Sequence, residues 1–224
     1  ALNIPFVIET NPKSVTEEKV RLLKEMNCVS ASIAIETGNI NMRRKILKRV
    51  DSKKDILRAF SLFKDVNIRT SSFNLLGIPF ESRKTYLSTV RLNKIANVHY
   101  PHMGFFYPFE GTELRKISIE KGFFNEDAPE TIVYRRDKPN LNFKRLSEEA
   151  LVEMRNVFVL YVKLPETFWP FIKRSEVRDS LGKQLRRKIL DFYEETVWKN
   201  DGWYIESNRE RQCLQELKDT LISR

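Results

Sequence analysis

The sequence is poor in the residues that build metal centres and disulfide frameworks. Its 224 residues include two cysteines and two histidines. Cys28 and Cys213 are far apart in the sequence, which argues against a disulfide framework, and two thiolates cannot hold a structural zinc ion without other ligands. His99 and His102 lie close together before an apolar strand, and a metal-binding pair there is possible but not favoured. Composition therefore points to no metal site.

Long apolar runs are also missing. No run approaches the roughly 18 apolar residues that a membrane-spanning helix needs. No secretory signal is visible, so we expect a cytoplasmic protein. The sequence has no repeats of fixed period and no low-complexity segments. It opens at Ala1, inside the approach to a strand and without an initiator methionine, and we expect it to be a piece of a longer protein.

Acidic residues are outnumbered by basic ones, 30 to 40, which gives a net charge of +10. Such a charge suits a nucleic acid, an anionic cofactor or a phosphate-bearing substrate. It equally suits a solvated surface, because the basic residues are spread along the chain. The run Lys183, Arg186, Arg187 and Lys188 is typical of a solvated helix face and could also contact nucleic acid. Charge alone leaves these alternatives open.

What the sequence does have is organised around residues 29–49. Residues 29–35 are small or β-branched, which indicates a buried strand, and the strand ends on Glu36. A turn at residues 37–39 contains a glycine, and a short basic helix follows. An acid is thus placed at the carboxyl end of a buried strand, where ligands bind in α/β folds. The plainer interpretation is a surface acid followed by a solvated basic helix.

Strands and helices alternate four times over about 120 residues. This pattern predicts an α/β fold, namely a partial parallel (β/α) barrel or sheet with the strands neighbouring in chain order and the helices on one face. The pattern then stops, and the rest of the chain is first irregular and then helical. The expected divisions are a barrel part at residues 1–124, an irregular connection at 125–146 and a helical region at 147–224. The expected strands are residues 4–9, 29–36, 68–76 and 103–107.

Each expected strand ends in a polar or sharply turning group. In a barrel these ends would form one rim and converge on one ligand. Carboxylates there could accept hydrogen bonds from sugar hydroxyls, and Arg43 or Arg49 could pair with a carboxylate. Each group is weak by itself, since glycine and proline commonly follow strands. The strand-end groups are Glu9, Glu36, Gly77-Ile78-Pro79, and Tyr107 with Gly111-Thr112 beyond it.

These motifs resemble the radical S-adenosylmethionine superfamily. The resemblance covers about residues 4–124. Within the superfamily it points to the cobalamin-binding branch related to anaerobic cyclases and methylthiotransferases. It implies a radical S-adenosylmethionine type of barrel, with S-adenosylmethionine, an iron–sulfur cluster and possible cobalamin as cofactors. The motifs are I-E-T-N-P, I-A-I-E-T-G-N with L-K-R, N-L-L-G-I-P-F-E-S, Y-P-F-E-G-T-E-L and E-K-G.

The resemblance also implies roles for single residues. Glu9 stands where the family has an acid near the adenosylmethionine, and Glu36 where an acid or amide approaches its ribose or amino-acid end. Arg49 stands where an arginine meets the carboxylate of the cofactor. Gly77 and Pro79 match the turn beside the adenine, although Phe80 replaces the usual glycine and could crowd that turn. At the fourth strand, Tyr107 lies at the rim, and Gly111-Thr112 of P-F-E-G-T matches the glycine and threonine of the family's rim motif.

One departure from the family is large. The cysteine triplet C-x-x-x-C-x-x-C, which holds the iron–sulfur cluster, is absent. We therefore expect either part of an enzyme that generates a 5′-deoxyadenosyl radical, inactive as this chain alone, or a degenerate member. The alternative function is a basic, non-catalytic module that binds RNA or a partner protein. A third hypothesis, an unrelated barrel that binds a phosphorylated metabolite, lacks a visible phosphate loop. The substrate, whether a small molecule or RNA, is not predicted.

Overall fold

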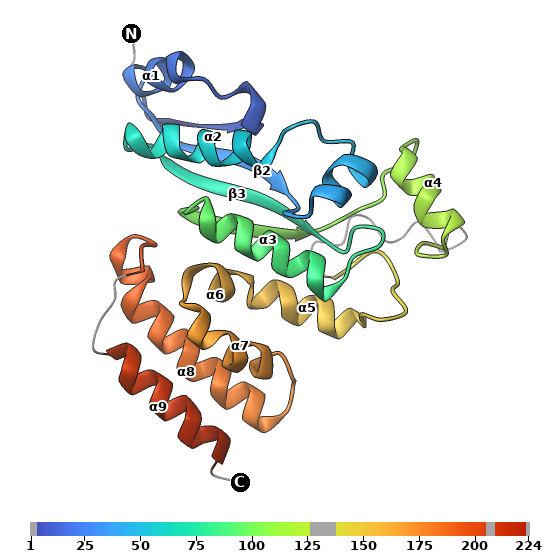
Figure 1. Ribbon diagram of the computed structural model, residues 1–224, viewed down its shortest axis with the longest axis vertical. Coiled ribbons are helices and arrows are strands. Elements are labelled where there is room, and N and C mark those ends of the chain that lie inside the picture. The colour runs from blue at the N-terminus through green and yellow to red at the C-terminus, as the bar shows by residue number, and fades with distance from the viewer. Residues whose placement is uncertain (1–3, 126–137, 205–208, 223–224) are drawn as a thin grey trace. The chain divides into compact units, whose positions relative to one another are not determined.

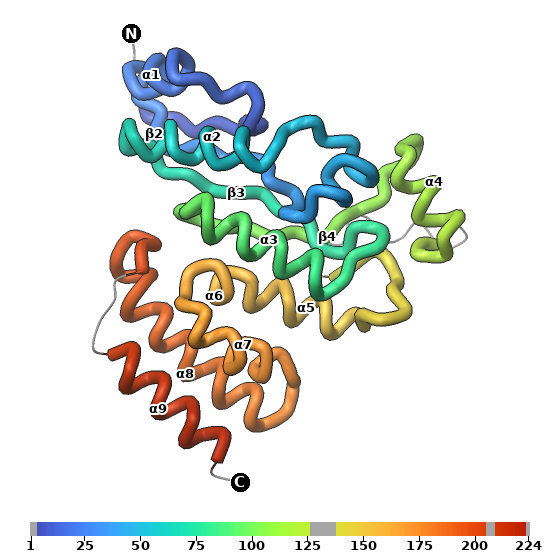
Figure 2. Tube along the Cα trace, in the orientation of Figure 1, coloured from blue at the N-terminus to red at the C-terminus, as the bar shows by residue number. Residues whose placement is uncertain are grey.

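The computed structural model describes residues 4–125, 138–204 and 209–222. The chain divides into two compact units, Ala1–Val152 and Glu153–Arg224. We call them the sheet unit and the helical unit and describe each by itself. Figure 2 follows the Cα trace through both units.

The sheet unit is built on four parallel strands that neighbour one another in chain order, as the alternation of strands and helices predicted. The fourth strand differs from the prediction: it begins three residues earlier and ends before Tyr107. Tyr100, Pro101 and His102 pair with residues 71–73 of the preceding strand, so sheet pairing extends through residues that no apolar run marks. The strands are β1 (Phe6–Thr10), β2 (Cys28–Glu36), β3 (Arg69–Leu76) and β4 (Tyr100–Phe105).

The helices that follow the strands begin at side-chain caps. At the start of the second helix, Ser52 and Asp55 form the reciprocal capping box, each accepting a hydrogen bond from the other's backbone. The spacing of Ser14 and Glu17 also fits a capping box, but Ser14 ends a short 3-10 turn and Thr16 is the cap of the first helix, so that box does not form. The elements are η1 (Pro12–Ser14), α1 (Glu17–Glu25), the π-helical turn η2 (Met42–Ile46), α2 (Lys53–Asp65), α3 (Arg83–Ile95) and α4 (Glu113–Glu120).

Alternation along the strands gives the sheet two different faces. Ala31, Ile33 and Ile35 are fully buried in one hydrophobic core with residues of α1, α2 and α3, which run alongside the strands in Figure 1. Burying an isoleucine side chain in this way is worth about 1.5–3 kcal/mol. One face of the sheet is therefore the helix-covered face, as predicted.

The other face carries polar and exposed side chains. Ser32 of β2 and Ser71 of β3 share a hydrogen bond of 2.7 Å between their hydroxyls. Phe73 is 38% exposed, and its ring centroid lies 6.2 Å from that of His102 on the paired strand. Val7, on the edge strand β1, is 67% exposed. We call this surface the open face of the sheet.

A second hydrophobic cluster lies where the strands end. Met42, Ile78, Phe106 and Leu141 are buried in it, and partly buried phenylalanines pack against it. The backbone N–H of Asn142 donates to the carbonyl of Phe123 at 2.8 Å, which ties residues 138–146 to the end of α4. The carboxyl edge of the sheet is thus packed by segments from four parts of the chain.

The helical unit forms its own core. Phe168 and Phe192 stack with ring centroids 4.9 Å apart, and Phe168 is fully buried, so both rings belong to this core. The long helix of this unit begins at Ser180, because Asp179 caps it by accepting from the N–H of Gly182. From α5, the elements are α5 (Glu148–Asn156), α6 (Phe158–Lys163), η3 (Glu166–Phe168), α7 (Trp169–Ser175), α8 (Ser180–Thr196), η4 (Trp198–Asn200) and α9 (Arg209–Ile222).

Candidate functional site

The predicted strand-end residues lie along the carboxyl edge of the sheet. Glu36 is the last residue of β2, Gly77 follows β3 directly, and Tyr107 comes two residues after β4. Glu9 is the penultimate residue of β1. Because all four strands are parallel, these ends point in the same direction. We call this edge the rim.

The centre of the rim is an ion pair between Glu36 and Arg49. The Glu36 side chain is 15% exposed and the Arg49 side chain 31% exposed, so both can meet a ligand from solvent. Pairing of β2 with β3 shifts register between Ala34 and Glu36, and Glu36 has a φ of 63°. This left-handed backbone is uncommon for a residue other than glycine and often marks a functional position.

A basic hollow of about 400 Å³ opens beside this pair. Arg49 lines it together with Arg44, Lys48 and Val50. Lys48 also pairs with Glu113 of α4 at 3.6 Å, on the surface. The hollow therefore presents guanidinium and ammonium groups to an anionic ligand, and Arg49 links it to the carboxylate of Glu36.

A second arginine of the same turn is buried. Arg43 is 2% exposed and forms an ion pair with Asp51. Its Nη1 donates to the carbonyls of Ile35 and, at 3.0 Å, Thr37. Burial, and next the positive charge of Arg49, lower the pKa of Arg43 to about 10. The expected basic helix is thus one short turn with a structural arginine inside, a role that the spacing of basic residues could not reveal.

The turn after β2 is fastened to α3. The N–H of Gly38 donates to Thr89 Oγ1 at 2.9 Å. A Cβ at Gly38 would lie 2.2 Å from the carbonyl oxygen of Ser88, so no larger residue fits without a backbone shift. Deeper along α3, Asn93 Nδ2 donates to Asn74 Oδ1 of β3 at 2.7 Å. These buried polar contacts hold the β2 and β3 ends in place and were missed at the sequence level.

The turn after β3 is buried. Gly77 has a φ of 78°, a conformation that favours glycine, and Pro79 is buried as well. Phe80 takes a φ of 69° and leaves its side chain 47% exposed, so it points out of the turn rather than filling it. Glu81 accepts a hydrogen bond from Thr85, and burial raises its pKa to about 7 against the effect of the hydrogen bonds.

Glu9 lies further from the carboxyl edge of the sheet than Glu36 does. It pairs with Ser32, four residues before Glu36, which corresponds to about 13 Å along the strand. The side chain of Glu9 is exposed on the edge strand. That Glu9 and Glu36 serve the same ligand stays a prediction.

The end of β4 contributes an aromatic pair and a helix start. The rings of Tyr107 and Phe109 meet edge to face with centroids 4.9 Å apart. Gly111 has a φ of 76°. Thr112 caps α4, its Oγ1 accepting from the N–H of Arg115 at 3.2 Å. The G-T motif therefore has a clear structural use in starting α4.

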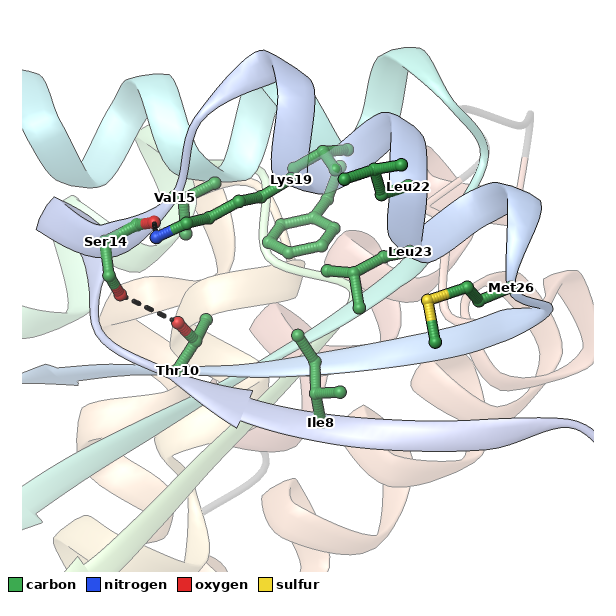
Figure 3. A pocket seen from close by; sticks show the side chains of 10 residues that line it. Ile8, Thr10, Ser14, Val15, Lys19, Leu22, Leu23 and Met26 are labelled. Carbon is green, nitrogen blue, oxygen red and sulfur yellow. Dashed lines mark hydrogen bonds between the residues drawn. The ribbon is translucent and has the colours of Figure 1, made fainter.

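An apolar groove of about 290 Å³ lies between β1 and α1 (Figure 3). Ile8 of β1 and Leu23 of α1 line it, with Met26 at one end. At the other end, Thr10 and Ser14 share a hydrogen bond of 3.1 Å. Its lining has no carboxylate and one ammonium group, and it borders the helix-covered face. The groove therefore differs in chemistry from the rim.

The cysteines do not fit an iron–sulfur cluster. Cys28 lies in the core of the sheet unit and Cys213 in the helical unit, and both are 2% exposed. Burial raises the pKa of the Cys28 thiol and raises that of Cys213 to about 11. A cluster needs accessible thiolates grouped together. Within residues 4–125, 138–204 and 209–222, no group of three or more His, Cys, Asp and Glu side chains is placed to hold a metal ion.

In the part of the chain that the structure describes, no helix combines the length and apolar character needed to cross a membrane.

Comparisons with known proteins agree with the motifs. The family model "Radical SAM superfamily" matches residues 1–92. The heme chaperone HemW of Bacillus subtilis is 29% identical over 80 residues, which cover 35% of this chain and 21% of that protein. The resemblance to the radical S-adenosylmethionine superfamily is thereby confirmed at the level of the superfamily.

One solved structure supports the fold. Coproporphyrinogen III oxidase (HemN) from Escherichia coli, a radical SAM enzyme, aligns with a TM-score of 0.51 at 10% identity and covers 72% of this chain and 33% of that one. Elp3 of the archaeon Methanocaldococcus infernus aligns with a TM-score of 0.47 at 21% identity over 53% of this chain and 28% of that one. The chain thus spans between about a fifth and a third of the length of these three proteins.

Proposed function

We propose that the rim binds S-adenosylmethionine as part of a radical S-adenosylmethionine enzyme. The observation that carries the proposal is the partly exposed Glu36–Arg49 pair beside the basic hollow. S-adenosylmethionine has ribose hydroxyls, an amino group and a carboxylate. A carboxylate can accept from the first two, and a guanidinium can bind the third through two hydrogen bonds.

Each strand end would have its own part in binding. Glu36 would accept hydrogen bonds from the ribose or the amino group, and Arg49 would bind the carboxylate. The Gly77–Pro79 turn would lie beside the adenine, and Tyr107 and Glu9 would border the ligand. None of these groups needs to transfer a proton, because their task is to orient the cofactor.

The wider activity rests on the family. An iron–sulfur cluster would supply the electron that cleaves S-adenosylmethionine to a 5′-deoxyadenosyl radical, which then modifies a substrate. Since the two cysteines of this chain do not fit as ligands, we propose that the cluster ligands lie outside these 224 residues. Cobalamin is a further proposed cofactor, supported by the motif resemblance to the cobalamin-binding branch. A cytoplasmic location likewise stays a prediction.

The test is anaerobic reconstitution of the protein as its gene encodes it. We expect a cysteine triplet in the full coding sequence, a coloured cluster after addition of iron and sulfide, and 5′-deoxyadenosine from S-adenosylmethionine. This chain alone should stay colourless and form no product. A full coding sequence without such a triplet, and a protein that forms neither cluster nor product, would contradict the proposal.

The alternative is a basic module that binds RNA or a partner protein without catalysis. The net charge of +10 favours it, as does the missing triplet. The same experiment separates the two functions, because a non-catalytic module would neither bind nor cleave S-adenosylmethionine.

A further inference from the structure

Another pocket, separate from the basic hollow and from the apolar groove, lies where β3 and α4 end. Its volume is about 350 Å³, within the range of small-ligand sites. Three chain segments line it: the residues after the β3 turn, the residues after α4, and the strip that precedes α5. The lining residues are Phe80, Glu81, Lys121, Gly122, Phe123, Asn142, Phe143, Lys144 and Arg145.

Three aromatic rings form one side of this pocket. The ring centroids of Phe80 and Phe123 are 5.4 Å apart in an edge-to-face arrangement, and those of Phe123 and Phe143 are also 5.4 Å apart. Phe123 and Phe143 pack against the cluster at the carboxyl edge, which fixes their positions. Phe80 is 47% exposed, although its left-handed φ of 69° is unfavourable for a bulky residue. An exposed ring held this way offers a flat surface on which another ring can stack.

Three cations surround the rings. Lys121, Lys144 and Arg145 are all exposed, and none of them forms an ion pair with another of the described residues. The remaining titratable group of the described lining, Glu81, is 8% exposed, and its carboxylate is held by Thr85 and by backbone N–H groups. The pocket therefore presents positive charge to its opening while its acid is turned into the protein.

We propose that this pocket binds a nucleoside phosphate, with the base stacked on Phe80 and the phosphate bound by Lys144 and Arg145. Aromatic rings interleaved with cations are the usual chemistry by which proteins hold nucleotides, since every base has a flat face and every phosphate a charge. The nucleotide could be free or part of a single RNA strand. Phe80 directly follows the Gly77–Pro79 turn, but the new site uses none of Glu36, Arg49 or the other residues of the basic hollow, so competition with S-adenosylmethionine distinguishes the two sites.

Binding of two probes tests the proposal and identifies the source. The probes are AMP and a fluorescent ten-nucleotide oligouridylate, each titrated into the full chain. Binding of both probes, or of either one, supports the site. Oligouridylate alone indicates a strand, and AMP alone indicates a free nucleotide. Failure of both probes to bind would overturn the proposal, as would displacement of bound AMP by S-adenosylmethionine.

Variants localise the binding. Phe80→Ala should weaken it about tenfold, the scale of one lost stacking contact, whereas Phe80→Tyr should stay within about twofold because it keeps the ring. Lys144→Gln with Arg145→Gln should weaken oligouridylate binding about tenfold and lower the salt slope by about 1.4.

The matched control is Lys64→Gln with Arg69→Gln. It removes the same charge at the opposite end of β3 and should change binding less than twofold. Equal weakening by both double variants would show charge attraction without a site. Circular dichroism of each variant checks that the fold is kept, and the comparison of the two double variants still decides the matter if Phe80→Ala does not fold.

Discussion

Two arginines of one short segment have opposite surroundings. Arg43 is buried behind the rim with Asp51, and its side chain is 2% exposed. Arg49, six residues later, is 31% exposed and pairs with Glu36 beside a hollow. The same residue type therefore serves the fold in one place and is open to a ligand in the other. Burial, rather than sequence motif, separates the two roles.

The difference has energetic consequences. Removing one partner of a buried ion pair leaves an uncompensated charge and costs about 3–5 kcal/mol. Removing one partner of a more open pair costs about 0–1 kcal/mol, because water takes its place. Variants behind the rim should therefore change stability, and variants at the open pair should change ligand binding.

The largest effect is expected behind the rim. Arg43→Met should lower the free energy of unfolding by about 3–5 kcal/mol, because Asp51 and the carbonyls of Ile35 and Thr37 lose their partner. Arg44→Met, one residue away and exposed, is the matched control and should stay within about 0.5 kcal/mol. Urea unfolding measures both. Equal losses would show that burial does not distinguish these arginines.

Glu81 extends the comparison to the turn after β3. Its pKa is raised from an ordinary 4.5 to about 7. Between these values the folded protein keeps a proton that the unfolded chain has lost, so stability should fall as pH rises through this window, by about 3 kcal/mol in total. The free energy of unfolding of the wild type and of Glu81→Gln is measured from pH 4 to 8. The wild type should lose stability relative to Glu81→Gln as pH rises. A wild type that instead gains stability relative to the variant would show that the carboxylate is ionised in the folded protein.

Two glycines differ in how much space surrounds them, and substitution by alanine should therefore change the stability of the protein by different amounts. Gly38→Ala should cost about 2–3 kcal/mol, because its Cβ would overlap the backbone of Ser88 and Thr89 in α3. Gly104→Ala should be nearly neutral, since no atom lies within 4 Å of the added Cβ. Thermal unfolding compares the two variants. A similar drop for both would mean that β2 and α3 do not meet as closely as the structure shows.

The sheet could be predicted because its signals are local. Buried runs such as residues 29–36 and the cap at Ser52 depend on near neighbours in the sequence. The start of β4 could not be predicted, because Pro101 and His102 are held there by pairing with β3. The order of the strands followed from the alternation alone.

The site was predicted only in part. Glu36 and Arg49 were named separately, and only the structure joins them in an ion pair. The burial of Arg43 depends on Asp51 and on carbonyls that only folding assembles. The aromatic pocket was missed for a similar reason, since Phe80, Phe123 and Phe143 are far apart in the chain and none carries a recognisable pattern.

The central claim is that the Glu36–Arg49 pair serves a ligand rather than the fold, and Glu36→Ala tests it most directly. Affinity for S-adenosylmethionine is measured by calorimetry on the protein as its gene encodes it, and stability by thermal unfolding of the same sample. We expect binding to weaken by about 1–3 kcal/mol, the scale of a lost charged hydrogen bond, and stability to change by less than about 0.5 kcal/mol. Unchanged affinity together with a large loss of stability would show that Glu36 is structural and would contradict the claim.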